Sequence, residues 1–240
     1  MSLIAWLPLL YGDLNDKCGR KVDTTFGVET PSSMYTGKIG NGYIFSSHGI
    51  RIKDIPVTKT MSFALWIKLT SNSACHILDL RGHDNGTETG YQPIYYDGSG
   101  IQIYSSAGSN SAYNSCYLGT SWHHLVVTIE DGHGRLYLDG VYQNENTSLV
   151  GCVDTCHLTL GCRCSGSNKM PGIIQDVRIY NHVLSTKEIK ELGRAMVLHY
   201  DFNTPLFEST TNIVSNPASW SPYTEYWHVV AYTSTGVKLV

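Results

Sequence analysis

Short segments in which apolar and polar residues alternate recur along the chain, and Gly, Asn and Asp separate them. In the clearest, residues 61–69, every second residue is large and apolar: Phe63, Leu65, Ile67 and Leu69. Successive side chains of a β-strand point to opposite faces, so this spacing puts all four on one side of an extended chain. Residues 101–104 repeat the pattern. Each segment therefore predicts a strand with one face in a core.

Two consecutive hairpins are predicted between residues 124 and 143. An apolar run at 124–130 precedes the turn-forming residues 131–134, and a second run at 135–138 returns along the first. Asp139 and Gly140 then predict a tight turn into a further strand. An Asp-Gly pair favours such a turn because Gly adopts the positive φ that a type I′ turn requires.

One short helix is predicted after residue 184. Ser185 and Glu188 have the spacing of a capping box, in which each side chain bonds the backbone N–H of the other residue. Leu184 and Ile189 occupy the positions of a hydrophobic staple, and Gly193 is placed to end the helix after about seven residues. Many strands with one short C-terminal helix predict an all-β sandwich of two sheets.

The pattern changes after Arg194. Residues 1–195 suit one large β-domain, and a strand-like pattern restarts at residue 197. Segments of about forty residues seldom form an independent β-domain. We therefore interpret residues 196–240 either as extra strands of the first domain or as the truncated start of a second β module.

The low content of charged residues bears on which partners the chain can bind. Charged residues make up 15% of the chain and the net charge is −3, without the clusters of Lys and Arg that bind nucleic acids or anionic membranes. No apolar run reaches the about 20 residues that span a bilayer. We therefore expect no nucleic-acid partner and no membrane insertion. Residues 2–10 lack the basic start and the cleavage site of a signal peptide, so they predict a first strand of a chain that folds in a reducing cytoplasm.

A cysteine-rich segment, residues 152–164, raises the question of a metal site. It contains His157 and the cysteines Cys152, Cys156, Cys162 and Cys164. On one extended strand, residues 156, 158, 160, 162 and 164 would form an apolar face and His157 would lie on the other. Free Cys behaves as a small hydrophobe. We therefore expect reduced, buried, metal-free thiols, with a zinc site as the alternative.

Three stretches resemble concanavalin A-like, laminin-G-type jelly-roll domains. They read GKIGNGYIF at 37–45, SWHHLVVT at 121–128 with RLYLDG at 135–140, and GIIQDVRIYNHVLS at 172–185. The resemblance implies a two-sheet antiparallel jelly-roll sandwich over residues 1–195. Members of the family bind glycans or proteins, or act as non-catalytic spacers.

Residues 5–9 are similar to the opening of laminin-G-like modules in bacteriophage tail and appendage proteins. This second resemblance implies a non-enzymatic, lectin-like module of a virion, assembled in the host cytoplasm. It also implies glycans or other virion proteins as partners and, by analogy, a homo-oligomer. A purely structural spacer without sugar binding and an ancillary module of a carbohydrate-active enzyme are the alternatives.

No catalytic residues are expected. Glucanases with this fold carry paired acids on one strand, because retaining hydrolysis needs two carboxyl groups about 5 Å apart. The sequence contains no E-x-D run of that kind.

No cofactor is required, although calcium is a possible one by resemblance. Several laminin-G-like domains bind calcium between an early acidic loop and the acids of the closing segment. The matching residues are Asp13, Asp16 and Asp176, whereas Gln175 replaces one acid of the closing pair. One charge fewer lowers affinity for calcium, and a structural role for these residues is the alternative.

A tyrosine-rich stretch, residues 91–117, is the candidate ligand site. Sugar rings stack on flat aromatic faces, and polar groups nearby can bond to the edges of the sugar. The predicted binding residues are Tyr91, Tyr95, Tyr96, Asp97, Tyr104, Asn110 and Tyr113. For each tyrosine, the alternative is a place in the core.

Overall fold

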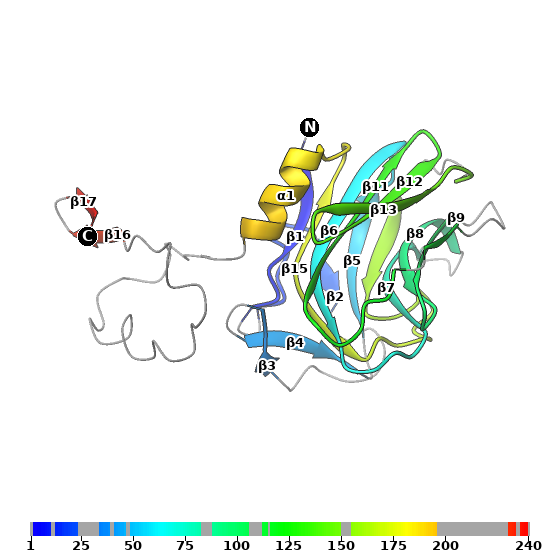
Figure 1. Cartoon of the computed structure of the whole chain (residues 1–240), viewed down its shortest axis with the longest axis horizontal. Helices are drawn as coiled ribbons and strands as arrows, with labels where there is room; N and C mark the ends of the chain where they lie inside the picture. The colour runs from blue at the N-terminus through cyan, green and yellow to red at the C-terminus, as the bar shows by residue number, and fades with distance from the viewer. Residues whose placement is uncertain are drawn as a thin grey trace. The chain divides into compact units, whose positions relative to one another are not determined.

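The alternating segments form two antiparallel sheets that pack face to face (Figure 1). The computed structural model describes residues 2–10, 13–23, 34–38, 41–46, 49–82, 88–105, 112–114, 116–149, 155–195, 230–233 and 236–239. Internal contacts divide the chain into one unit over Met1–Leu198 and another over His199–Val240. The prediction of an all-β, two-sheet antiparallel sandwich is confirmed.

The first sheet has eight strands. In spatial order they are β13 (Val141–Asn146), β12 (His133–Leu138), β11 (His123–Glu130), β6 (Thr60–Leu69), β15 (Gly172–Tyr180), β4 (Asn41–Phe45) and β3 (Met34–Thr36), and β1 (Leu3–Leu7) pairs with β15.

The second sheet has seven strands. Their order is β10 (Ala112–Asn114), β9 (Ile101–Ser105), β8 (Glu88–Tyr96), β7 (Cys75–Gly82), β14 (Thr155–Leu160), β5 (Ile50–Pro56) and β2 (Val22–Asp23).

Strand β15 joins three neighbours because a bulge divides it. Its residues Gly172–Ile174 pair with β4, and its last four residues pair with β1, while β6 lies along its other side. The register with β6 shifts between Gln175 and Arg178, and Asp176 has a φ of 51°. A bulge bends a strand locally. The part of β15 that follows the bulge therefore pairs with β1, the first strand of the chain.

Both predicted hairpins are present. The β11–β12 turn consists of Asp131 and Gly132, with φ of 45° and 86°, and the β12–β13 turn consists of Asp139 and Gly140, with φ of 50° and 78°. Two successive positive φ values are the signature of a type I′ turn. The predicted first turn at 131–134 is too long, because residues 133 and 134 already pair with β11.

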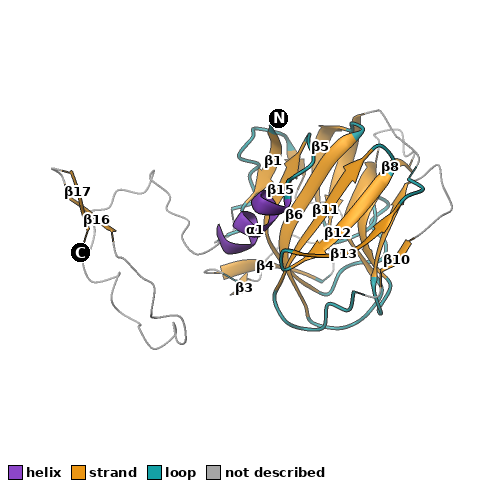
Figure 2. Cartoon of the chain, turned by 45° about the horizontal axis from the view of Figure 1, so that its top comes forward, coloured by secondary structure: helices purple, strands orange, loops and turns teal. Residues whose placement is uncertain are grey.

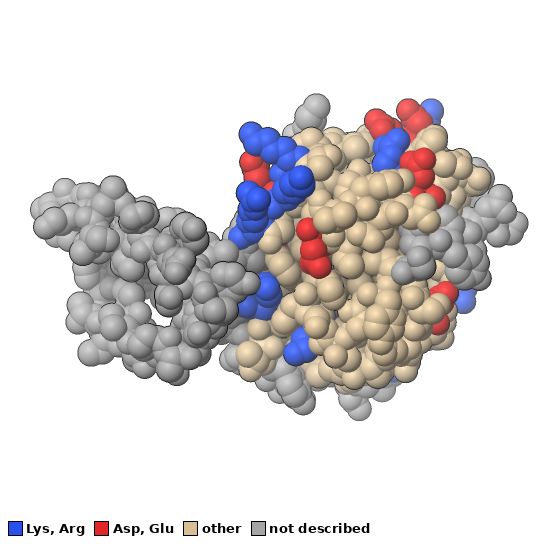
Figure 3. All heavy atoms as spheres, in the orientation of Figure 1, with Lys and Arg blue, Asp and Glu red and all other residues tan. Residues whose placement is uncertain are grey.

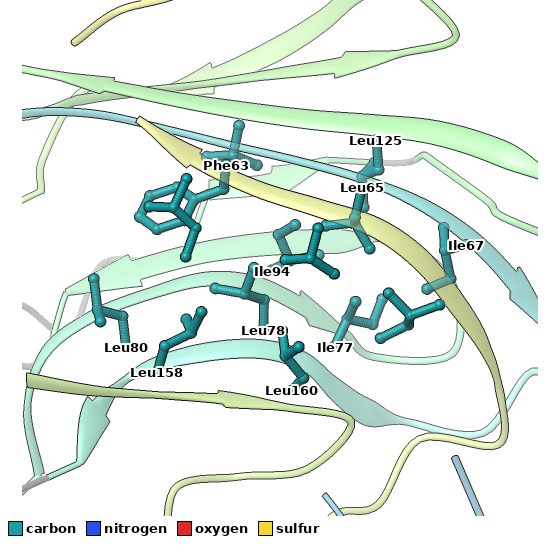
Figure 4. Packing of buried hydrophobic residues seen from close by; sticks show 14 of the residues in the cluster. Phe63, Leu65, Ile67, Ile77, Leu78, Leu80, Ile94, Leu125, Leu158 and Leu160 are labelled. Atoms are coloured by element: carbon teal, nitrogen blue, oxygen red, sulfur yellow. The ribbon is translucent and has the colours of Figure 1, made fainter. Parts of the chain in front are cut away.

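The core lies between the two sheets and consists mainly of residues that alternation places inward, with both Ile77 and Leu78 buried where the register of β7 shifts (Figure 4). The labelled residues of Figure 4 come from β6, β7, β8, β11 and β14, and all are buried: Phe63, Leu65, Ile67, Ile77, Leu78, Leu80, Ile94, Leu125, Leu158 and Leu160. Burying each such side chain contributes about 1.5–3 kcal/mol. The predicted inward face of residues 61–69 is thereby confirmed.

Helix α1 (Thr186–Ala195) packs on the outer face of the first sheet (Figure 2). The capping box is confirmed, because the Glu188 N–H donates to Ser185 Oγ over 3.3 Å and the Ser185 N–H donates to the Glu188 carboxylate over 2.7 Å. Leu184 and Ile189 are both buried. The predicted stop at Gly193 is wrong, since the helix continues to Ala195.

Gly193 has a packing role instead of a stopping role. A Cβ at this position would lie 3.1 Å from Nδ1 of His124, a buried residue of β11. The missing side chain therefore lets α1 lie close against the sheet.

The cysteine-rich segment is only partly a strand. Strand β14 ends at Leu160, and Gly161 has a φ of 75°. Cys156 lies in the core, as predicted, whereas Cys162 and Cys164 lie beyond the strand in a loop that is still buried. The prediction of buried thiols is confirmed for these three residues, which form no disulfide. Cys152 lies outside the described residues.

In the second unit, the structure describes an antiparallel pair, β16 (Val230–Thr233) with β17 (Gly236–Leu239). The interpretations of residues 196–240 stay predictions, because most of that segment lies outside the described residues.

Gly161 tests the turn that ends β14. We expect Gly161→Ala to destabilise the protein by about 2 kcal/mol or more, because an L-residue is strained at positive φ and the new Cβ would collide with the ring of Phe45. Gly166→Ala is the matched control, since Gly166 has a φ of 86° but nothing within 4 Å of an added Cβ. Urea unfolding should give a larger loss for Gly161→Ala, and equal losses would contradict the predicted collision.

His124 predicts an acid-sensitive fold. Only 2% of it is exposed, and burial lowers its pKa to about 4 despite the nearby Asp176 and Asp139 carboxylates, which act to raise it. An unfolded chain takes up this proton near the ordinary pKa of about 6.5. Stability is therefore full above about pH 6.5 and is lost as the pH falls towards 4, by about 3 kcal/mol in total.

Unfolding free energies at about pH 7.5 and about pH 5 test this linkage. We expect His124→Gln to flatten the fall in stability between the two values, because a Gln side chain takes up no proton in this range. An unchanged slope in His124→Gln would refute the assignment.

Candidate functional site

The outer surface of the second sheet carries a group of aromatic and amide side chains over β7, β8 and β9. In the register of these strands His76 pairs with Tyr95, and Tyr95 pairs with Gln102. Tyr104 lies two residues beyond Gln102 and so points to the same side. Since the residues between them, such as Cys75, Tyr96 and Ile101, lie in the core, these side chains face outward. We call His76, Tyr95, Gln102 and Tyr104 the tyrosine face.

The rings of the tyrosine face are stacked obliquely. The ring centroids of His76 and Tyr95 are 4.7 Å apart at 54°, and those of Tyr95 and Tyr104 are 6.3 Å apart at 52°. Both tyrosines are half-buried, whereas His76 is buried. Two partly open aromatic rings supported from below can pack against the apolar face of a sugar ring or of another flat group.

Asp97 braces this face from the turn after β8. Its Oδ1 accepts hydrogen bonds from Ser99 N, Ser99 Oγ and Gly100 N, each 2.8 Å long. Its Oδ2 accepts from Gln102 Nε2 over 2.7 Å, and Gln102 Oε1 in turn accepts from the Tyr104 hydroxyl. The chain Asp97–Gln102–Tyr104 therefore fixes the orientation of one ring.

The same bonds keep Asp97 ionised. Partial burial acts to raise the pKa of Asp97, but the hydrogen bonds from Ser99, Gly100 and Gln102 outweigh it, and the pKa lies below its ordinary value. The site therefore holds a carboxylate anion at neutral pH.

The structure separates the predicted binding residues into three groups. Tyr95, Asp97 and Tyr104 lie at the tyrosine face. Tyr91 and Tyr96 have 1% and 0% of their surface exposed and belong to the core, so they present no ring to a ligand. Asn110 lies outside the described residues; Tyr113 pairs with Gln102 in the register of β10 with β9, and its side chain lies outside them.

A bulge explains why two tyrosines turn inward. The register of β8 with β9 shifts between Gln92 and Tyr95. Regular alternation would put Tyr91 and Tyr95 on one face, but an extra residue reverses the faces beyond the bulge. Tyr91 and Tyr96 therefore share the core.

Sequence reasoning missed His76 and Gln102. The signal for Gln102 was present, because Ile101, Gln102, Ile103 and Tyr104 alternate and so put Gln102 beside Tyr104. His76 had no comparable signal, since it precedes three apolar or acidic residues in a strand that bulges after it.

The three carboxylates predicted to bind calcium all accept hydrogen bonds from described donors. Asp16 accepts from the N–H groups of Trp6 and Arg20 over 2.6 and 2.9 Å. Asp176 accepts from Trp6 Nε1 and Arg178 Nε over 2.7 and 2.8 Å. Asp13 holds Asn15 and pairs with Lys17. Because these donors occupy the carboxylates, the geometry favours the structural alternative.

Within the described part of the chain, no group of three or more His, Cys, Asp and Glu side chains lies close enough to hold a metal ion. Among the same residues, no helix is long and apolar enough to cross a membrane.

Charge is unevenly distributed over the surface. On the face shown in Figure 3, Lys and Arg gather over α1, which exposes Lys187, Lys190 and Arg194. Helix α1 covers the first sheet, whereas the tyrosine face belongs to the second. The basic group and the aromatic group therefore lie on opposite sides of the sandwich.

Residues 40–190 match the sequence profile of the concanavalin A-like lectin/glucanases superfamily, of the type called Laminin_G_3. The chain belongs to this superfamily. Its fold, with two antiparallel sheets and one short helix, agrees with that membership.

Among curated proteins, the chain is similar to the adhesion G-protein coupled receptor V1 of Danio rerio, with 25% identity over 187 residues. The match covers 68% of this chain and 3% of the receptor, so the chain spans only a small part of that relative.

Two solved structures show the same fold. Domain 4 of AbnA, an extracellular GH43 arabinanase from Geobacillus stearothermophilus in complex with arabinotriose, superposes with a TM-score of 0.65 at 20% identity, covering 80% of this chain and 98% of that one. The receptor binding domain of botulinum neurotoxin type G has a TM-score of 0.62 at 14% identity, covering 82% of this chain and 52% of that one.

Proposed function

We propose that the chain is a non-catalytic binding module that holds an oligosaccharide on the tyrosine face. The observation that carries this proposal is the pair of half-buried rings, Tyr95 and Tyr104, braced by Gln102 and Asp97. Rings held in place lose little conformational entropy on binding, and this favours them as contact residues.

The arrangement of acids supports a binding role over hydrolysis. Asp79 lies on the outer face of β7, and its two oxygens accept from Arg81 Nε and a terminal nitrogen of Arg81 over 2.7 and 2.8 Å. The backbone N–H of Cys164 also donates to it over 3.0 Å. A retaining glycosidase needs two available carboxyl groups about 5–5.5 Å apart, and an acid enclosed in this way does not supply one.

The similar solved structures are consistent with a module that binds a ligand. One similar structure is a domain of an arabinanase with arabinotriose bound, and another is the receptor binding domain of a toxin. The first also supports the alternative of an ancillary module in a carbohydrate-active enzyme.

The location in a phage virion, the contact with other virion proteins and the homo-oligomer stay predictions. They rest on the similarity of residues 5–9 to phage appendage modules. Mass spectrometry of purified virions and light scattering of the purified protein test them.

A glycan array tests the binding function. We expect the full chain to bind at least one oligosaccharide, and Tyr95→Ala or Tyr104→Ala to weaken that binding about tenfold or more, because truncating a central aromatic contact costs about 1.4 kcal/mol or more. The melting temperature of each variant shows whether the fold is intact.

Tyr142→Ala is the matched control. Tyr142 is 50% exposed but lies on β13 at the edge of the first sheet, so its loss should leave binding unchanged. A blank array with a stable protein partner would favour the spacer alternative. Binding lost in Tyr142→Ala but kept in Tyr95→Ala would place the site elsewhere.

A further inference from the structure

We propose that the tyrosine face selects neutral oligosaccharides against sugars that carry a carboxylate, such as sialic and uronic acids, because the Asp97 carboxylate stands at its edge and pairs with no cation of the described residues. This inference rests on the proposed oligosaccharide binding and adds the chemical class of the ligand.

The described residues that donate hydrogen bonds to the Asp97 carboxylate are all neutral. Its four hydrogen bonds come from Ser99 N, Ser99 Oγ, Gly100 N and Gln102 Nε2. Within the described residues it makes no ion pair with Lys, Arg or His. Neutral N–H and O–H groups stabilise the anion but leave its net charge in place, so a second anion nearby is repelled.

The anion lies close to the ring that would contact the ligand. One amide group, that of Gln102, separates the Asp97 carboxylate from the Tyr104 hydroxyl. The two oxygens are therefore within about 8 Å, the distance over which charges at physiological salt still act on one another. At that range the repulsion of a sugar carboxylate corresponds to a preference of about threefold to tenfold for the neutral sugar.

The Asp79–Arg81 ion pair of β7 does not offset the anion. Asp79 and Arg81 neutralise each other through two bonds on β7, and the Arg81 side chain is largely buried. Arg81 therefore offers a sugar carboxylate little accessible positive charge.

Lys169 is one described cation for which the experiment needs a control. It follows Asn168, whose carbonyl oxygen accepts from the His76 N–H over 3.0 Å. Its backbone therefore lies close to His76, which pairs with Tyr95 in the register of β7 with β8. Its contribution must be measured separately.

Asp97→Asn isolates the charge because the hydrogen bonds can persist. The Asn oxygen can accept from Ser99 and Gly100, and its NH₂ group can donate to Gln102 once the Gln102 amide has turned over. The turned amide then donates to the Tyr104 hydroxyl, which both donates and accepts. We expect this variant to fold and to keep the orientation of Tyr104.

The experiment uses matched pairs of glycans on an array, each a neutral oligosaccharide and its sialylated or uronic acid counterpart. The wild-type chain should bind the neutral member at least about threefold more tightly, and Asp97→Asn should bring the ratio of the two affinities close to one. Higher salt should shrink the wild-type preference.

Two control variants complete the design. Glu191→Gln removes an equal charge from the exposed surface of α1, where the side chain is 61% exposed, and should leave the ratio unchanged. Lys169→Gln should also leave the neutral preference in place.

The outcomes separate this inference from the function on which it rests. Equal or tighter wild-type binding of the acidic members, or a ratio that Asp97→Asn does not alter, overturns the selectivity while the binding function stands. A loss of acidic binding in Lys169→Gln with no effect of Asp97→Asn also overturns it. An array without any bound glycan overturns both.

Discussion

Burial of one face of each sheet is the constraint on which the rest of the structure depends. The inward residues of β6, β7, β11 and β14 fill the space between the sheets, and a strand with one face committed to a core has only its other face free for function. On the first sheet, Ile189 of α1 and the preceding Leu184 pack on Ala64 of β6 and Val126 of β11 and cover that part of the outer face. The outer face of the second sheet over β7, β8 and β9 carries the polar and aromatic residues instead.

On that outer face, one polar connection gives the aromatic surface its shape. Asp97 closes the turn after β8 and also holds Gln102, which holds Tyr104. Asp97, which the sequence suggests as a ligand contact, thus positions Gln102 and Tyr104 through hydrogen bonds. Its negative charge pairs with no cation of the described residues and therefore acts on any ligand bound at the site. Asp16 and Asp176, which were predicted as calcium ligands, likewise accept hydrogen bonds from the two N–H groups of Trp6.

Local rules predicted much of the fold, because the features concerned depend on neighbouring residues. The Asp-Gly turns, the Ser185–Glu188 capping box and the inward face of residues 61–69 are all set within a few positions. The failures arise where tertiary contacts change a local pattern. A bulge in β8 turns Tyr91 inward, the approach of α1 to His124 explains Gly193, and the turn at Gly161 takes Cys162 off the strand. Tyr95 and Tyr96 are adjacent and must face opposite ways in a strand, so the sequence alone excluded one of them from a shared surface.

The central claim is that a ligand packs on the rings of the second sheet, and the tyrosine ring resonances of the full chain test it most directly. In an NMR titration with the best oligosaccharide from an array, the ring signals of Tyr95 and Tyr104 should shift together and saturate, while that of Tyr142 on β13 stays in place. Saturable shifts confined to Tyr142 or to tyrosines of the first sheet, with Tyr95 and Tyr104 unmoved, would contradict the account.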